Sequence, residues 1–148
     1  MYAALLRRRS VHLIFVFTCS VLANMAALAA DSSKPKSNIL DGMQFVGETG
    51  EQGKGDHHAD TITFKDGIFR SLDCENWGFG PAPYSVEQQG ETYRFSSILV
   101  SPDLGTLEWK GTIIGETANG TFRWTHKRWY GTIKRDYWYK GTKRSSQQ

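Results

Sequence analysis

The sequence is poor in cysteine, with only Cys19 and Cys74 among its 148 residues. Two cysteines form at most one intramolecular disulfide, so a disulfide-rich scaffold is excluded. Cys19 lies in an N-terminal segment with the features of a removable leader, so we expect Cys74 to have no disulfide partner. Asp73 and Glu75 flank Cys74 and disfavour a thiolate. We therefore interpret Cys74 as a small buried residue, and a redox or cofactor-attaching thiol is the alternative.

Acidic residues are absent from the first 30 positions. Arg7 to Arg9 precede an apolar run from Val11 to Leu22, and small residues follow that run. This layout is typical of a secretory signal peptide, and Ala27-Leu28-Ala29 fits the small-x-small cleavage rule. The alternative, a retained membrane anchor, needs a longer run of about 20 residues. We predict a signal peptide over 1–29 and a periplasmic or secreted mature chain without a transmembrane segment.

The mature chain lacks a net charge, because 15 acidic and 15 basic residues remain after position 29. The two signs are separated along the chain. Residues 31–120 contain 7 basic and 14 acidic residues, whereas 121–148 contain 8 basic and 1 acidic residue. Such asymmetry can reflect an anionic partner, although the basic strands could also neutralise the acidic ones across a closing sheet. Aromatic rings are interleaved with the basic residues: Arg123, Trp124, Lys127, Arg128, Trp129, Tyr130, Lys134, Arg135, Trp138 and Lys140.

Helical periodicity is also missing, and period-two alternation takes its place. Leu107, Trp109 and Ile113 share one face of their segment, for example. Turn signals such as Asp66-Gly67 separate eight predicted strands, over 39–47, 61–65, 68–74, 84–88, 92–100, 106–114, 121–126 and 133–141. About 118 mature residues make one domain. We predict an all-β, eight-stranded antiparallel up-and-down barrel over 39–142, because closure removes sheet edges. A two-sheet sandwich is the alternative. A polar leader over 30–38 and a disordered tail over 143–148 flank the domain.

Five stretches carry a family resemblance: "FKDGIFRS", "CENWGFGPAPY", "GTLEWKGTIIG", "GTFRWT" and "YWYKGT". They resemble a family of small exported bacterial proteins without an assigned activity, whose pattern is similar to lipocalin-like and other calycin-type barrels. The resemblance covers roughly residues 41–142. It implies a lipocalin-like barrel and says little about mechanism, because folds of this type carry many functions.

The most informative candidate site is the bent, aromatic stretch at 75–84. Gly78 and Gly80 permit positive φ, and the two neighbouring prolines stiffen the loop. Its rings, Trp77, Phe79 and Tyr84, form either a rim over the barrel mouth or a plug that fills it. For a rim, the predicted walls are Phe95, Leu107, Trp109, Phe122 and Trp124, and Arg70 and His126 are predicted to orient a ligand.

Other chemistry is weakly supported. "GDHHAD" contains Asp56, His57, His58 and Asp60, but no spacing matches a known metal frame, and His126 is the one other mature histidine. We interpret that stretch as a solvated loop, with His57 and His58 as weak metal candidates. The sequence has no Gly-x-Ser-x-Gly, phosphate-loop or dinucleotide motif, and Asp73, Glu75 and Glu108 form no recognisable acid–base pair.

We predict an exported, non-catalytic binding protein that takes a small, partly apolar molecule at the barrel mouth, without a cofactor. One alternative is an interaction module whose basic, aromatic C-terminal face docks on an anionic envelope component. Export makes such a component, lipid or polysaccharide, a better partner than nucleic acid. A metal-binding protein or a minor enzyme is the further alternative.

Overall fold

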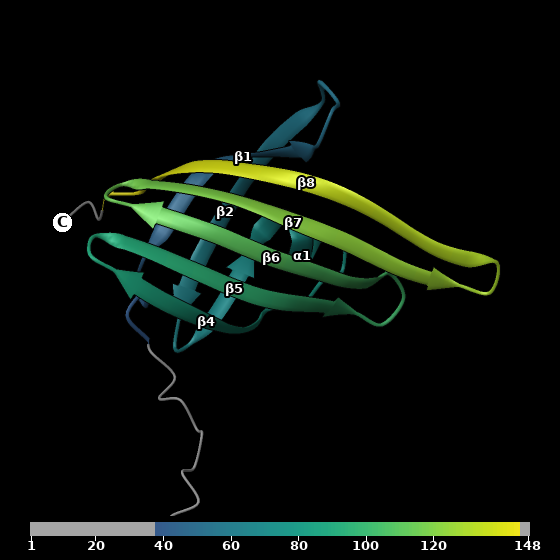
Figure 1. Cartoon of the computed structure of the whole chain (residues 1–148), viewed down its shortest axis with the longest axis horizontal. Helices are drawn as coiled ribbons and strands as arrows, with labels where there is room; N and C mark the ends of the chain where they lie inside the picture. The colour runs from purple at the N-terminus through teal and green to yellow at the C-terminus, as the bar shows by residue number, and fades with distance from the viewer. Residues whose placement is uncertain (1–37, 146–148) are drawn as a thin grey trace, which may run out of the picture. The chain divides into compact units, whose positions relative to one another are not determined.

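The computed structural model describes residues 38–145 and consists of eight strands and one short helix (Figure 1). The strands are β1 (Gln44–Glu51), β2 (His57–Lys65), β3 (Ile68–Ser71), β4 (Ala82–Gln89), β5 (Thr92–Ser101), β6 (Gly105–Ile114), β7 (Thr117–Arg128) and β8 (Gly131–Lys143). The helix, α1, spans Leu72–Asn76 between β3 and β4. The predicted signal peptide and most of the predicted polar leader lie outside the described residues. Within them, no helix is long and apolar enough to cross a membrane.

All eight strands belong to one antiparallel sheet that closes in a ring. Each strand pairs with the next along the chain, and β1 pairs with β8 from Phe45↔Lys143 to Glu51↔Tyr137. The predicted all-β class and the eight antiparallel strands are therefore confirmed. The β1–β8 pairing leaves no open sheet edge between the first and last strands, as expected for a chain this rich in strands.

The weakest junction of the ring lies between β3 and β4. These strands share two residue pairs, Ile68↔Pro83 and Phe69↔Ala82, whereas β7 and β8 share twelve. After Ser71 the chain leaves the sheet, forms α1 and a loop, and returns at Ala82. Two prolines at 81 and 83 cannot donate ladder hydrogen bonds, so they limit pairing at the start of β4.

Several predicted boundaries differ from the observed ones. The first strand begins at Gln44, not at 39, because residues 39–42 form turns. The polar loop predicted between 47 and 61 is shorter, since β1 continues to Glu51 and β2 starts at His57. Residues 72–74, predicted as strand, belong to α1. Ser71 caps this helix by accepting a hydrogen bond from the Cys74 amide, which stabilises a helical turn where the strand would otherwise continue.

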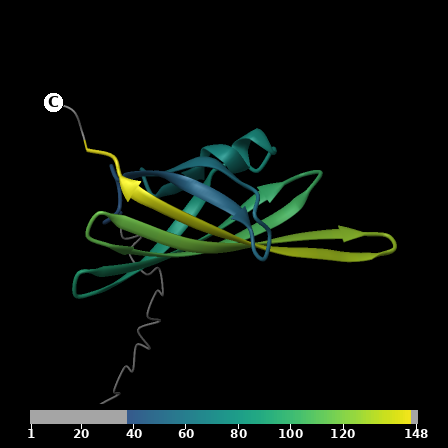
Figure 2. The same cartoon turned by 90° about the horizontal axis from the view of Figure 1, so that it is seen from above.

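The ring has two dissimilar ends. At the end where β1 starts, called here the Leu40 end, Leu40 is fully buried and Asp41 accepts hydrogen bonds from the Tyr84 hydroxyl and the Gly67 amide. The opposite end, called the α1 end, carries α1, the β1–β2 loop, the β5–β6 loop and the β7–β8 hairpin. Figure 2 shows that hairpin reaching beyond the neighbouring strands.

Aromatic side chains fill the interior toward the Leu40 end. Alternation places one face of every strand inside, and the buried rings contact one another in sequence: Phe64 with Phe95 at 4.9 Å between ring centres, Phe95 with Phe69 at 5.4 Å, and Phe69 with Trp109 at 5.1 Å. Trp109 and Tyr139 are 1% exposed. The interior of an eight-stranded ring is wide enough to be filled by side chains or to hold one small ligand. This half of the ring is filled.

Candidate functional site

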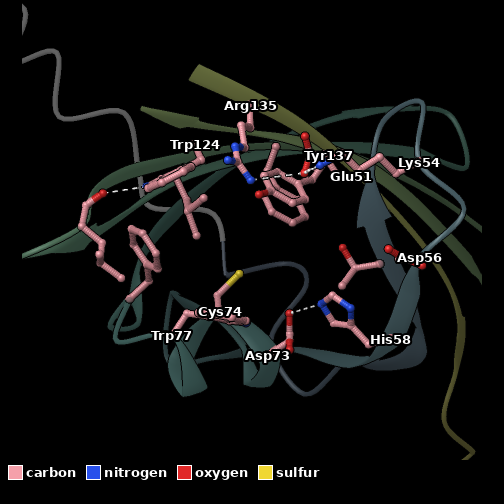
Figure 3. A pocket seen from close by; sticks show the side chains of 15 residues that line it. Glu51, Lys54, Asp56, His58, Asp73, Cys74, Trp77, Trp124, Arg135 and Tyr137 are labelled. Atoms are coloured by element: carbon pink, nitrogen blue, oxygen red, sulfur yellow. Dashed lines mark hydrogen bonds and ion pairs between the residues drawn. The ribbon is translucent and has the colours of Figure 1, made fainter. Parts of the chain in front are cut away.

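A pocket of about 440 Å³ occupies the α1 end of the ring (Figure 3). Its floor continues the aromatic packing below it, because Phe122 lies between Trp109 and Tyr137. The Trp109 and Phe122 rings stack at 4.2 Å, and the Phe122 and Tyr137 rings stack at 4.9 Å and 5°. Phe122 and Tyr137 face the pocket, whereas Trp109 lies beneath. Fifteen residues line the space: Thr49, Glu51, Lys54, Asp56, His58, Asp73, Cys74, Trp77, Phe79, Leu104, Leu107, Phe122, Trp124, Arg135 and Tyr137.

One side of the pocket is apolar. Phe79, Leu104, Leu107 and Trp124 form it, and Trp77 stands at its edge with 64% of its surface exposed. The Trp124 indole Nε1 donates to the Leu104 carbonyl at 2.7 Å, so this ring has a fixed orientation and no unsatisfied donor. The apolar side can therefore receive a hydrophobic group without leaving the Trp124 indole unpaired.

The other side is charged. Glu51 pairs with Lys54 at 2.9 Å and with Arg135 at 3.5 Å, and His58 bonds Asp73 at 2.9 Å. The Arg135 guanidinium also lies 5.7 Å from the centre of the Trp124 ring, which places it between the two sides (Figure 3). Three acids (Glu51, Asp56, Asp73) and two strong cations thus face one space whose floor is aromatic. This division suits a molecule with an apolar body and a polar group.

A buried hydrogen-bond network holds α1 at the pocket. The Asp60 carboxylate, 3% exposed, accepts from the Ser71 hydroxyl at 2.8 Å and from the Asp73 amide at 3.0 Å. Ser71 in turn accepts from the Cys74 amide at 3.2 Å. Burial raises the pKa of Asp60, and these hydrogen bonds oppose part of that rise. The network fixes the backbone of Asp73 and Cys74, and so holds α1 at the pocket wall.

Among the described residues, Cys74 is the one thiol that lines the pocket. Burial is the main cause that raises the pKa of its thiol to about 12, and the nearby carboxylates of Asp60 and Asp73 contribute to that rise. The thiol is therefore protonated at neutral pH and is not an activated nucleophile. Glu75, which the sequence placed beside Cys74, instead holds Arg70 in a two-bond ion pair at 2.7 and 2.9 Å.

The structure brings together three of the predicted ligand-binding residues, Trp77, Phe79 and Trp124, with the predicted walls Leu107 and Phe122. The other predicted residues lie elsewhere. Phe95 and Trp109 are buried in the packed interior, and Tyr84 is buried at the Leu40 end with its hydroxyl on Asp41.

Arg70 is exposed and paired with Glu75, outside the pocket. His126 is buried at the base of the β7–β8 hairpin against Trp124, and its Nδ1 has no hydrogen-bond partner among the described residues. A second hollow of about 1060 Å³ runs along β4 to β7, where Tyr84 and Phe95 border it among outward-facing polar residues.

The two weak metal candidates lie on opposite faces of β2. His58 points into the pocket and bonds Asp73, whereas His57 lies outside near Glu48, 3.7 Å away. Among residues 38–145, no group of three His, Cys, Asp or Glu side chains is close enough to hold a metal ion.

Sequence reasoning did not identify the charged side of the pocket. Glu51, Lys54 and Asp56 lie in the polar loop predicted between 47 and 61. Arg135 was assigned only to the basic, aromatic C-terminal face, and Tyr137 had no role beyond the strand predicted over 133–141. Their common location follows from ring closure, which pairs Glu51 with Tyr137 across β1 and β8. No local sequence signal reveals that pairing.

No protein-family model, curated protein or solved structure matches the chain.

Proposed function

We propose that this chain is an exported, lipocalin-like barrel that binds a small, partly apolar molecule in the pocket at the α1 end. The observation that carries the proposal is the pocket itself. It measures about 440 Å³, lies inside the closed sheet, and has aromatic side chains on one side and charged side chains on the other. Known ligand pockets fall in the range of roughly 300–1,000 Å³ and combine apolar walls with few placed polar groups.

The ligand's apolar body would lie on the floor formed by Phe122 and Tyr137 and against Trp124. Burying such a body releases water from both surfaces and supplies most of the binding free energy. Its polar group would meet Arg135 and Glu51, which are already paired with each other across 3.5 Å. A ligand with a hydrogen-bonding or charged end can exchange partners with that pair, so its orientation is determined as well as its affinity.

The features of this pocket suit ligand binding better than catalysis by the Cys74 thiol. The raised pKa keeps Cys74 protonated, and His58 is engaged with Asp73 at 2.9 Å. Oriented side chains with satisfied hydrogen bonds, such as Trp124, are typical of a preformed binding site.

The decisive experiment is native mass spectrometry of the protein purified from its own host. We expect a small molecule to be retained, and the intact mass of the protein to match a chain that begins at Ala30 or Asp31 if the leader is cleaved. Trp77→Ala should lower the affinity for the retained molecule about tenfold, because this exposed indole becomes covered when the pocket is occupied.

Trp129→Ala is the matched control, since Trp129 is 96% exposed on the β7–β8 hairpin and does not line the pocket. It should leave retention unchanged. A bare protein mass from the native host, together with no binding of a fluorescent apolar probe to the purified protein, would contradict the proposal.

A further inference from the structure

The β7–β8 hairpin extends beyond the rest of the sheet. β6 accompanies β7 as far as the pair Thr106↔Thr125, and β1 accompanies β8 only as far as Glu51↔Tyr137. Beyond these points the two strands pair with each other alone, through His126↔Ile133 to Arg128↔Gly131. Figures 1 and 2 both show this projection at the α1 end. Residues 127–134 are called here the hairpin tip.

The tip presents two aromatic rings to solvent. Trp129 is 96% exposed and Tyr130 is 62% exposed. Their rings contact each other at 5.3 Å and 89°, so they stand edge to face and pack against no core. Trp129 is the most exposed of the large hydrophobic side chains in the described part of the chain. Such residues at a projecting tip indicate an interaction surface.

The tip also carries cations without ion-pair partners. Lys127, Arg128 and Lys134 form no salt bridge with any described carboxylate, whereas nearby Arg123 pairs with Asp136 at 2.7 Å. Lys134 is close enough to help lower the pKa of Asp136, but Arg123 is the main cause of that shift and already binds the carboxylate. Three positive charges therefore surround the two exposed rings.

We propose that the hairpin tip docks on the surface of an anionic lipid bilayer. Trp and Tyr prefer the membrane–water interface, where the ring is buried and its polar edge stays hydrated. Lys and Arg beside them are attracted to anionic headgroups. Both groups occur together on this projecting turn, which can enter the headgroup region without unfolding of the closed sheet.

The geometry favours lipid over the other candidate partners. A polysaccharide needs a flat aromatic platform or a groove, and two rings at 89° on a convex turn provide neither. A protein partner needs a broad complementary surface, typically about 800 Å² per side, whereas the tip spans eight residues. This proposal concerns a surface outside the pocket and does not depend on the proposed ligand.

The test is co-sedimentation of the protein with vesicles of phosphatidylcholine mixed with phosphatidylglycerol, compared with phosphatidylcholine alone. The protein is produced with its own N-terminal segment in an exporting host, and intact masses establish that all variants share one N-terminus. We expect binding to the mixed vesicles that weakens at high salt. The variant Lys127→Gln/Arg128→Gln/Lys134→Gln should lose roughly 100-fold in affinity, from roughly fivefold per cation.

A matched triple variant removes the same charge elsewhere. Lys65→Gln/Lys110→Gln/Lys143→Gln changes three exposed lysines outside the tip and should bind nearly as well as the parent. Trp129→Ala should weaken binding at least about tenfold, whereas Trp77→Ala, in the pocket, should not. Circular dichroism confirms that each variant folds.

Equal losses in the two triple variants would overturn the proposal, because they would indicate nonspecific charge attraction. Retention on an anionic polysaccharide without vesicle binding would overturn it as well. Loss of vesicle binding in Trp129→Ala, with ligand retention unchanged, would support docking of the hairpin tip on lipid. It would also show that lipid docking and ligand binding are independent.

Discussion

The Cys74 thiol should be almost inert in the folded protein, although it lies at the wall of the pocket. Its side chain is 4% exposed, and burial raises the pKa of the thiol to about 12 from an ordinary value of 9.0. Thiol reagents react with the thiolate. At pH 8 the thiolate fraction is about one in 10,000 at the raised pKa and about one in ten at the ordinary value. We therefore expect a reaction about 1,000-fold slower in the folded protein than in the urea-unfolded chain.

The assay is alkylation with iodoacetamide at pH 8, followed by intact mass measurement over time. A Cys74→Ser variant gives the background from Cys19 if the N-terminal segment is retained. In that same background, Ser145→Cys places a thiol at an exposed position and should react at the rate of the unfolded chain. Reaction of native Cys74 within tenfold of the unfolded rate would refute the reasoning from burial.

Three further predictions concern the ring. Gly111→Ala should lower the free energy of unfolding in urea by about 1–3 kcal/mol, because a Cβ there would overlap the Phe95 ring. Gly120→Ala should cost less, because a Cβ at Gly120 would lie 3.3 Å from the nearest atom, the Lys110 carbonyl oxygen. Equal effects of the two substitutions would contradict this reasoning. Leu40→Ala should cost about 2–5 kcal/mol, because Leu40 is fully buried at its end of the ring, and an unchanged unfolding midpoint would exclude that role. Burial raises the pKa of Asp60 above 3.8, so the folded protein holds this proton more tightly than the unfolded chain. Stability should therefore fall as pH rises from 3.8 to the raised folded value, and Asp60→Asn should lack this decrease; parallel pH profiles would disprove it.

Alternation within single strands was the part of the fold that the sequence could predict. Leu107, Trp109 and Ile113 were expected on one face, and all three are buried inside the ring. Hairpin turns such as Asp66-Gly67 were equally clear from the sequence. The structure confirms this turn, in which Asp66 and Gly67 both adopt positive φ. These features are local, so a few residues are enough to specify them.

The helix was missed because it is too short to show a period. Five residues cover little more than one turn, which is too few for a helical stripe to be recognised. The available signal was Ser71 followed by Asp73 and Glu75, a cap with acids in the first turn.

The pocket was predicted only in part for a similar reason. The ring-rich stretch pointed to Trp77 and Phe79, which do line it. Tyr84, five residues after Phe79, lies at the other end of the ring because β4 runs away from α1. The charged side depends on which strands close the ring, and contacts between residues more than 80 positions apart leave no trace in a local pattern.

The two-pair junction between β3 and β4 has a consequence for motion. Local opening occurs where the fewest backbone hydrogen bonds must break, so the ring should part at this junction before any other. The amides of β3 and β4 that face this junction should then exchange their hydrogens early, while β7 and β8 stay protected by their long pairing. Because Cys74 lies directly after β3, such an opening would expose it. The junction is thus a second route to the interior, separate from the pocket mouth. Water or a small solute would enter there without unfolding of the sheet.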